Sequence, residues 1–244
     1  MFGAIPTLIQ DDPEFSESPS LVLIHDGGGT TINYYFLGDL DRHVWGISNE
    51  RLVEENAWPG GIKQMAQVYS ELIQSELPNG PLIFGGWSIG GLIALEMAKI
   101  FAGNTEFHIL GVVMIDTFHP LARDIGISQD ISAIEWGEAT TEESKQVTLK
   151  SIRNCSKFAQ QWGRDSLKGF GISEKLPPVI LLCASEGYDI SMSEDKLGWE
   201  NYQHDFFSHV LNVPGNHHSL FADENVSGLT EQLSEACQIL EEGF

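Results

Sequence analysis

Ser88 stands in the motif G-W-S-I-G at residues 86–90, where an exposed hydroxyl could act as a nucleophile. An apolar run at 82–84 precedes the motif and a helical pattern at 91–98 follows it, which is a strand-turn-helix context. Only glycine fits beside the serine in so tight a turn, because a Cβ would collide with the strand or the helix. The helix N-terminus lets the amide of Ile89 face a developing oxyanion. We therefore predict that Ser88 is a catalytic nucleophile.

A base and an acid that could activate this serine follow later strands of the chain. Asp116 comes directly after the apolar run 109–115, and His217 follows the last expected strand. His217 would take the Ser88 proton during attack on a carbonyl, while Asp116 would hold the imidazole tautomer and stabilise its cation. The chain order Ser, Asp, His is the order found in α/β-hydrolases.

The acid and the base each have an alternative. Asp189 follows the penultimate expected strand, but it lies in a loop containing Gly and Ser that has an ordinary solvated-turn explanation. We favour Asp116 because no residue separates it from its strand. His218 is the alternative base, and since consecutive residues cannot both point into one site, we favour His217.

A second oxyanion donor is expected from the loop after the first buried strand. The segment H-D-G-G-G-T at 25–30 occupies that place, and its glycines allow the backbone to approach a substrate closely. The amide of Asp26 is our candidate donor. No G-K-[ST] sequence accompanies the glycines, so we do not expect a nucleotide site.

Short β-type runs alternate with helical patterns along the chain, and this alternation must position the three side chains. It implies a mostly parallel central sheet flanked by helices on both faces, with sites at the carboxyl ends of the strands. Ser88, Asp116 and His217 all fall at such ends. We expect strands at 21–24, 43–47, 82–84, 109–115, 179–183 and 206–213, and helices at 61–76, 91–98 and 226–240.

Length and composition fit a single domain at residues 1–244, with 42% apolar residues. No apolar run approaches the roughly 18 residues of a membrane span, and the N-terminus lacks the basic start of a signal peptide, so we expect a cytoplasmic protein. The cysteines are odd in number and widely spaced, which favours buried thiols over disulfides or a metal site. They are Cys155, Cys183 and Cys237.

The formal net charge of −22 argues against nonspecific binding to nucleic acid or to an anionic membrane. The charge is unevenly distributed. The last sixty residues carry twelve acidic side chains against one basic side chain, Lys196. Residues 145–175 hold seven of the thirteen basic residues, namely Lys145, Lys150, Arg153, Lys157, Arg164, Lys168 and Lys175.

Four blocks follow one another along the chain: I-H-D-G-G-G at 24–29, G-G-W-S-I-G-G at 85–91, M-I-D-T at 114–117 and V-P-G-N-H at 213–217. Together they resemble the thioesterase domains of polyketide synthases and nonribosomal peptide synthetases, in the order in which that family carries them. The tryptophan before Ser88 and the sequences at 39–46 and 60–62 are similar to those of fungal-type members. The resemblance spans about residues 21–222.

This resemblance implies an α/β-hydrolase fold that needs no cofactor and no metal. It implies an acyl or peptidyl carrier protein, or a megasynthase, as partner. Ser88 would take an acyl, polyketide or peptidyl chain from the phosphopantetheine thioester and release it to water or to an internal nucleophile. A carboxylesterase or lipase acting on free esters is one alternative. A non-catalytic hydrolase fold that serves as a small-molecule receptor is another.

The family also bears on the acid and the base. Its releasing thioesterases carry the acid at the position of Asp116, whereas many stand-alone proofreading members carry it at the position matched by Asp189, so the subtype stays open. Members often have an aromatic residue after the catalytic histidine, where this chain has His218. Met1 and the lack of a carrier-protein motif favour a stand-alone protein.

Finally, the resemblance implies a helical lid inserted at about 120–176, between core segments at about 20–119 and 177–244. At about 100° per residue, one helix face there is apolar: Leu149, Ile152, Cys155, Phe158, Ala159 and Trp162. We expect this face to line the substrate chamber, with Trp87, Phe158 and Trp162 as candidate lining residues; the alternative is an ordinary solvated amphipathic helix. A basic stripe would face outwards as a candidate docking site for an acidic carrier protein: Lys150, Arg153, Lys157 and Arg164.

Overall fold

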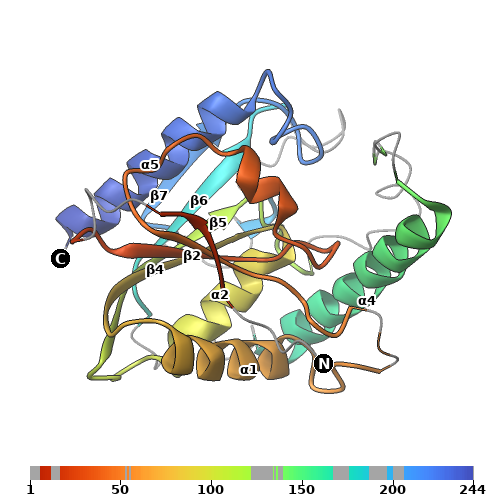
Figure 1. Ribbon diagram of the computed structural model, residues 1–244, viewed down its shortest axis with the longest axis horizontal. Coiled ribbons are helices and arrows are strands. Elements are labelled where there is room, and N and C mark those ends of the chain that lie inside the picture. The colour runs from red at the N-terminus through yellow and green to blue at the C-terminus, as the bar shows by residue number, and fades with distance from the viewer. Residues whose placement is uncertain are drawn as a thin grey trace.

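The computed structural model describes residues 6–11, 17–52, 54, 56–121, 134, 136, 140–166, 176–186, 197–199 and 206–243. A seven-stranded sheet runs through its centre in the order β1-β3-β2-β4-β5-β6-β7 (Figure 1). β1 is antiparallel to β3, and all other neighbours are parallel. The strands are β1 Thr7–Gln10, β2 Ser20–Ile24, β3 Val44–Ile47, β4 Gly80–Trp87, β5 Phe107–Ile115, β6 Val179–Ala184 and β7 His209–Val213. The mostly parallel sheet is confirmed.

Helices cover both faces of this sheet, as the alternating pattern predicted. Helices α1 and α2 lie on one face and α5 lies on the other (Figure 1). Alternate residues of β2 point to opposite faces, so Val22 packs with α1 and α2 while Leu23 packs with α5. The helices are α1 Gly61–Glu76, α2 Ile89–Ile100, α4 Glu142–Ser166 and α5 Val226–Glu242, with a 3-10 helix η2 at Ile32–Phe36.

Several local features differ from the expectations, and β4 and α2 extend beyond the expected bounds on both sides. β1 and η2 were not expected from the sequence. β1 is only four residues long and is partly exposed at the edge of the sheet. β7 begins at His209 and not at Phe206, because the Phe206 ring stacks on Trp199 with centroids 4.8 Å apart. Apolar side chains before β7 therefore join an aromatic cluster instead of extending the strand.

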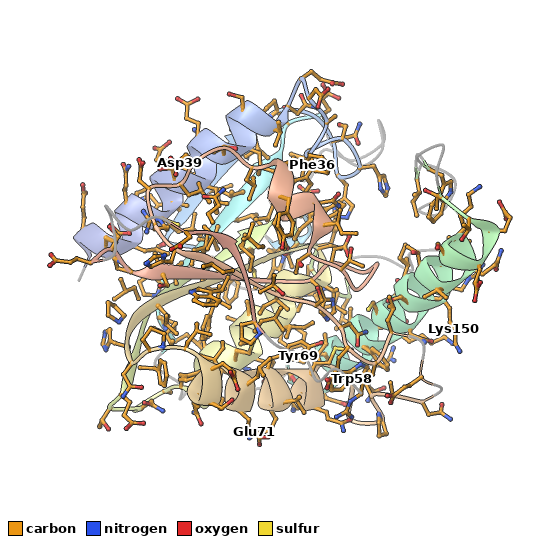
Figure 2. The ribbon with its side chains drawn as sticks, viewed as in Figure 1. Phe36, Asp39, Trp58, Tyr69, Glu71 and Lys150 are labelled. Atoms are coloured by element: carbon orange, nitrogen blue, oxygen red, sulfur yellow. The ribbon has the colours of Figure 1, made fainter. Side chains whose placement is uncertain are left out.

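Helix α4 lies within the segment that the family resemblance assigns to a lid. Its C-terminal half lies near α1 and α2, while its N-terminal end runs out from the core (Figure 1). Trp162 is buried, and its Nε1 donates to Glu96 Oε1 on α2 at 2.6 Å. The four residues of the basic stripe are all exposed, as expected. Figure 2 labels Lys150 of this stripe on α4.

The three cysteines are free and buried, as the sequence predicted. Among the described residues, no helix combines the length and the apolar character needed to cross a membrane.

Candidate active site

Ser88 sits at the point where β4 turns into α2. Its backbone angles are φ 59° and ψ −122°, a region that side chains other than glycine rarely occupy, and its N–H donates to Ile115 O at 2.9 Å. The turn is closed by two glycines, because a Cβ on Gly86 would lie 2.5 Å from the carbonyl carbon of Gly90. Backbone strain of this kind collects at functional sites, and the turn has the form of a nucleophile elbow.

Asp116 follows β5 directly and is 1% exposed. Its N–H donates to Leu182 O at 2.7 Å, and its Oδ1 accepts the N–H of Ala184 at 2.8 Å, so β6 fixes the residue from one side. Its second oxygen, Oδ2, lies 2.7 Å from His217 Nδ1. The structure thus brings together an acid and a base that lie 101 residues apart.

His217 lies in the loop after β7, which is fixed by its own hydrogen bonds. Asn216 and Ser219 exchange backbone and side-chain bonds across the turn, and Gly215 has φ 81° in space where a Cβ would meet Asn225. Because Nδ1 donates to Asp116 in the neutral ring, Nε2 is the basic nitrogen. The ring is 5.2 Å from the Trp87 ring and 5.1 Å from Phe118.

The two alternatives have different outcomes. The side chain of His218 is exposed, and its ring meets that of His217 edge to face at 5.3 Å. The ring of His217 is the one that contacts the Asp116 carboxylate, which favours this residue as the base. Asp189 lies outside the described residues, so its role stays a prediction.

The candidate oxyanion donors belong to neighbouring segments. Ile89 opens α2, and Asp26 opens the glycine loop after β2. The Asp26 carboxylate accepts the N–H of Gly29 at 3.1 Å. Burial raises the pKa of Asp26 to about 6, although nearby amides and His217 act in the opposite direction. The Asp26 side chain therefore adds a titratable group beside the base.

His25 precedes Asp26 and is fully buried. Burial lowers its pKa to about 4, so the ring is neutral at physiological pH. Its Nδ1 lies 2.7 Å from Asp26 O and its Nε2 lies 2.9 Å from the Tyr69 hydroxyl. A carbonyl only accepts, so Nδ1 carries the proton and Nε2 accepts the hydrogen bond from Tyr69.

The three candidate chamber residues occupy different places. Trp87 packs against His217, and its buried Nε1 has no hydrogen-bond partner among the described residues. Phe158 lies beside Gly61, where α1 begins. Trp162 anchors α4 to Glu96. Contact with an acyl chain stays a prediction for all three.

Helix α4 also lies beside the glycine loop. Cβ atoms built at Gly27, Gly28 and Gly29 would lie 3.6 Å from Ile152, 3.5 Å from Thr148 and 3.3 Å from Ser151, respectively. The candidate lid and the candidate oxyanion loop therefore lie side by side, with no room for larger side chains at these glycines.

Several residues that shape the site were not predicted from the sequence. Phe118 packs on His217, and its position two residues after Asp116 was a usable signal. Phe221 packs on Trp87, with ring centroids 5.1 Å apart. Tyr34 lies on η2, a helix that no sequence pattern predicted, and its hydroxyl accepts the N–H of Trp87 at the end of β4.

Comparisons with known proteins agree on one family. The model of the thioesterase domain family matches residues 19–237. Thioesterase frbE of Dothideomycetidae sp. (strain 11243) is 35% identical, with 98% of this chain and 97% of that protein covered. The nonribosomal peptide synthetase imqB of Aspergillus flavus is 29% identical over 97% of this chain, which corresponds to 8% of the synthetase.

Among solved structures, the NocB thioesterase domain in covalent complex with a fluorophosphonate nocardicin G analogue is similar to this chain. The TM-score is 0.71 at 23% identity, with 92% of this chain and 96% of that chain covered. This similarity concerns the fold, which is the α/β-hydrolase fold expected from the sequence.

Proposed function

The chain belongs to the thioesterase domain family and is a hydrolase related to fungal thioesterases, and from this premise we propose a substrate and a mechanism. The proposed substrate is an acyl, polyketide or peptidyl thioester on the phosphopantetheine arm of a carrier protein. The observation that carries the proposal is the 2.7 Å contact between Asp116 and His217 at the edge of the sheet that carries the Ser88 elbow.

In the first step, Ser88 Oγ attacks the thioester carbonyl and its proton passes to His217 Nε2. Asp116 stabilises the imidazolium through Nδ1. The backbone amides of Asp26 and Ile89 donate hydrogen bonds to the negatively charged carbonyl oxygen. The C–S bond then breaks, and the leaving thiolate takes the proton from His217. The products are an acyl-Ser88 ester and the free phosphopantetheine thiol.

In the second step, the nucleophile is either water or a group within the bound acyl chain. It loses a proton to His217 and attacks the acyl-Ser88 carbonyl. The ester bond breaks, and His217 returns the proton to Ser88 Oγ. Water releases an acid, whereas an internal nucleophile releases a cyclic product. Because a thioester is already activated, no cofactor or metal enters either step.

The proposed partner is a carrier protein, within a megasynthase or tied to one. The relationship to a region of the synthetase imqB supports a partner of this kind. The stripe Lys150, Arg153, Lys157 and Arg164 is exposed and offers a positive surface on an otherwise acidic protein. Three buried free thiols fit a reducing compartment, and we place the enzyme in the cytoplasm.

The test of the substrate class compares one acyl group in three forms: on a holo carrier protein, on free pantetheine, and as a simple oxygen ester. We expect kcat/KM to be highest for the carrier-bound thioester and lowest for the ester. A preference for the ester would favour the carboxylesterase alternative instead.

A further inference from the structure

The oxyanion hole proposed above draws its two amides from different parts of the chain. Asp26 follows β2 and Ile89 follows β4, and the two strands separate after the pairing of Ile24 with Gly86. Two amides bind an oxyanion only when both stay about 2.7–3.1 Å from it. Some contact must therefore hold the two segments together beyond the end of the ladder.

One such contact is the close approach of backbones at Gly90. A Cβ built on this residue would lie 2.5 Å from Ile24 O and 2.7 Å from His25 O. The first turn of α2 thus rests on the residues that lead into the glycine loop. This approach brings the segments together, but it contains no directional bond that would set their separation.

The hydroxyl of Tyr34 supplies directional bonds at the same place. It accepts the N–H of Trp87 at 2.9 Å and donates to Ile24 O at 2.7 Å. Tyr34 is 1% exposed, so water does not compete for these bonds. The hydroxyl bridges β2 and β4 where they diverge, one residue before Ser88 and two residues before Asp26.

A second tyrosine holds the loop from the opposite layer. Tyr69 lies on α1 (Figure 2), is fully buried, and donates to His25 Nε2. His25 in turn donates from Nδ1 to Asp26 O, the carbonyl of the residue that carries the proposed amide donor. Trp58 packs edge to face on the Tyr69 ring at 5.8 Å and restricts it further.

We propose that Tyr34 and the Tyr69–His25 pair are positioning residues that set the geometry of the oxyanion hole from two sides. Neither tyrosine is assigned contact with the substrate; each acts through backbone groups of the loop or the elbow. The inference rests on the proposed function, because it takes the amides of Asp26 and Ile89 as the donors.

The test uses Tyr34→Phe, with Tyr35→Phe as the matched control because Tyr35 is the next residue and is 53% exposed. Loss of one oxyanion donor costs about 10²–10³ in kcat, and displacement of the donors should cost less, about tenfold to hundredfold. We expect kcat of Tyr34→Phe to fall in that range with KM almost unchanged. Tyr69→Phe should lower kcat in the same direction, and Tyr35→Phe should match the wild type.

A transition-state analogue separates positioning from stability. In a trifluoromethyl ketone, Ser88 Oγ adds to the carbonyl, its proton goes to His217, and the resulting hemiketal oxyanion lies in the hole. Affinity for this inhibitor should fall by the same factor as kcat in Tyr34→Phe and Tyr69→Phe, when measured well below the melting temperature of each variant. The pH profile of kcat should keep its shape, because His217 and Asp116 are untouched.

The outcomes distinguish this proposal from the proposed function. If wild-type protein is inactive on thioesters and does not bind the ketone, the proposed function fails. If wild-type protein is active but Tyr34→Phe and Tyr69→Phe keep wild-type kcat and ketone affinity and lose only melting temperature, the two tyrosines are merely structural. That result would overturn the positioning proposal alone.

Discussion

Both oxygens of the Asp116 carboxylate are engaged, one by the N–H of Ala184 and one by His217. Asp116→Asn would keep the shape of the side chain but would present an NH₂ group to Nδ1 or reverse the histidine tautomer. We expect kcat to fall by a factor on the order of 10⁴, as in the best-studied triad. Steady-state kinetics on one thioester substrate measures the loss.

Asp189→Asn is the control for this substitution, and we expect only a mild effect on kcat. The reverse ranking of the two variants would move the acid to Asp189. Intermediate losses in both would mean that each carboxylate contributes.

Because the pKa of Asp26 is raised in the folded protein, we expect the free energy of unfolding to depend on pH. This pKa is raised by burial from 3.8 to about 6, so the folded state binds more protons than the unfolded state between these values. Stability from this group is present below pH 3.8 and is lost as the pH rises through 6. Asp26→Asn removes that loss, so the melting temperature of the variant relative to wild type should increase from pH 4 to pH 7.

His25 titrates in the same range, but it is present in both proteins and cancels in the difference. Asp39→Asn, at an exposed carboxylate, controls for the loss of one negative charge from an acidic protein. A difference between Asp26→Asn and wild type that is constant with pH would show that Asp26 does not titrate as described.

Some residues of the site could be predicted from the sequence and others could not. Ser88, Asp116 and His217 follow buried strands, and the carboxyl ends of parallel strands meet at one edge, so their proximity could be expected. Tyr34 and Phe221 gave no comparable signal, and Phe118 gave only its place two residues after Asp116. Their roles depend on tertiary packing against Trp87 and His217, which no local pattern encodes.

Among the secondary-structure elements, α4 is tied to the core by a buried hydrogen bond. Trp162 Nε1 donates to Glu96 Oε1, which also lies 2.8 Å from Lys99 Nζ. Trp162→Phe keeps an aromatic ring but removes a hydrogen bond to a charged group, worth about 1.5–3 kcal/mol. We expect a loss of that order in the free energy of unfolding and faster amide exchange within residues 142–166.

Gln161→Ala, at the exposed neighbouring position, should leave both quantities close to wild type. Equal exchange in the two variants would mean that α4 is held by other contacts. Since Ile152 of α4 lies beside Gly27 of the loop, faster exchange in the loop of Trp162→Phe would link the two elements directly.

Elements with a regular spacing of apolar residues could be predicted from the sequence. The expected bounds of α1 agree with the structure, because its apolar residues recur at helical spacing and all pack on one face of the sheet. β1 could not be predicted, since it is held by antiparallel pairing with β3 and has no run of buried residues of its own. Pairing partners distant in sequence decide such edge strands.

At the scale of the whole molecule, charge should govern the encounter with a carrier protein. A protein of net charge −22 repels an acidic partner unless the partner meets a local basic surface. Reversing two charges of the stripe, Lys150→Glu with Lys157→Glu, should raise KM for the carrier-bound substrate, most strongly at low salt. Hydrolysis of a small free thioester should not change.

Lys63→Glu on α1 is a control for charge reversal away from the stripe, because Lys63 is exposed like Lys150 and Lys157, and it should leave KM for the carrier-bound substrate close to wild type. Equal effects of the double variant on carrier-bound and free thioesters would point to damage to α4. No effect on either substrate would leave the stripe as an ordinary solvated helix face.

An acyl ester on Ser88 is the intermediate that defines the proposed mechanism, and intact-protein mass spectrometry after rapid mixing with an acyl-pantetheine thioester detects it. We predict one added acyl mass that maps to the peptide containing Ser88, and we predict that it disappears in Ser88→Ala together with turnover while the melting temperature is retained. An acyl adduct on another residue, or near-normal turnover by Ser88→Ala, would show that Ser88 is not the nucleophile.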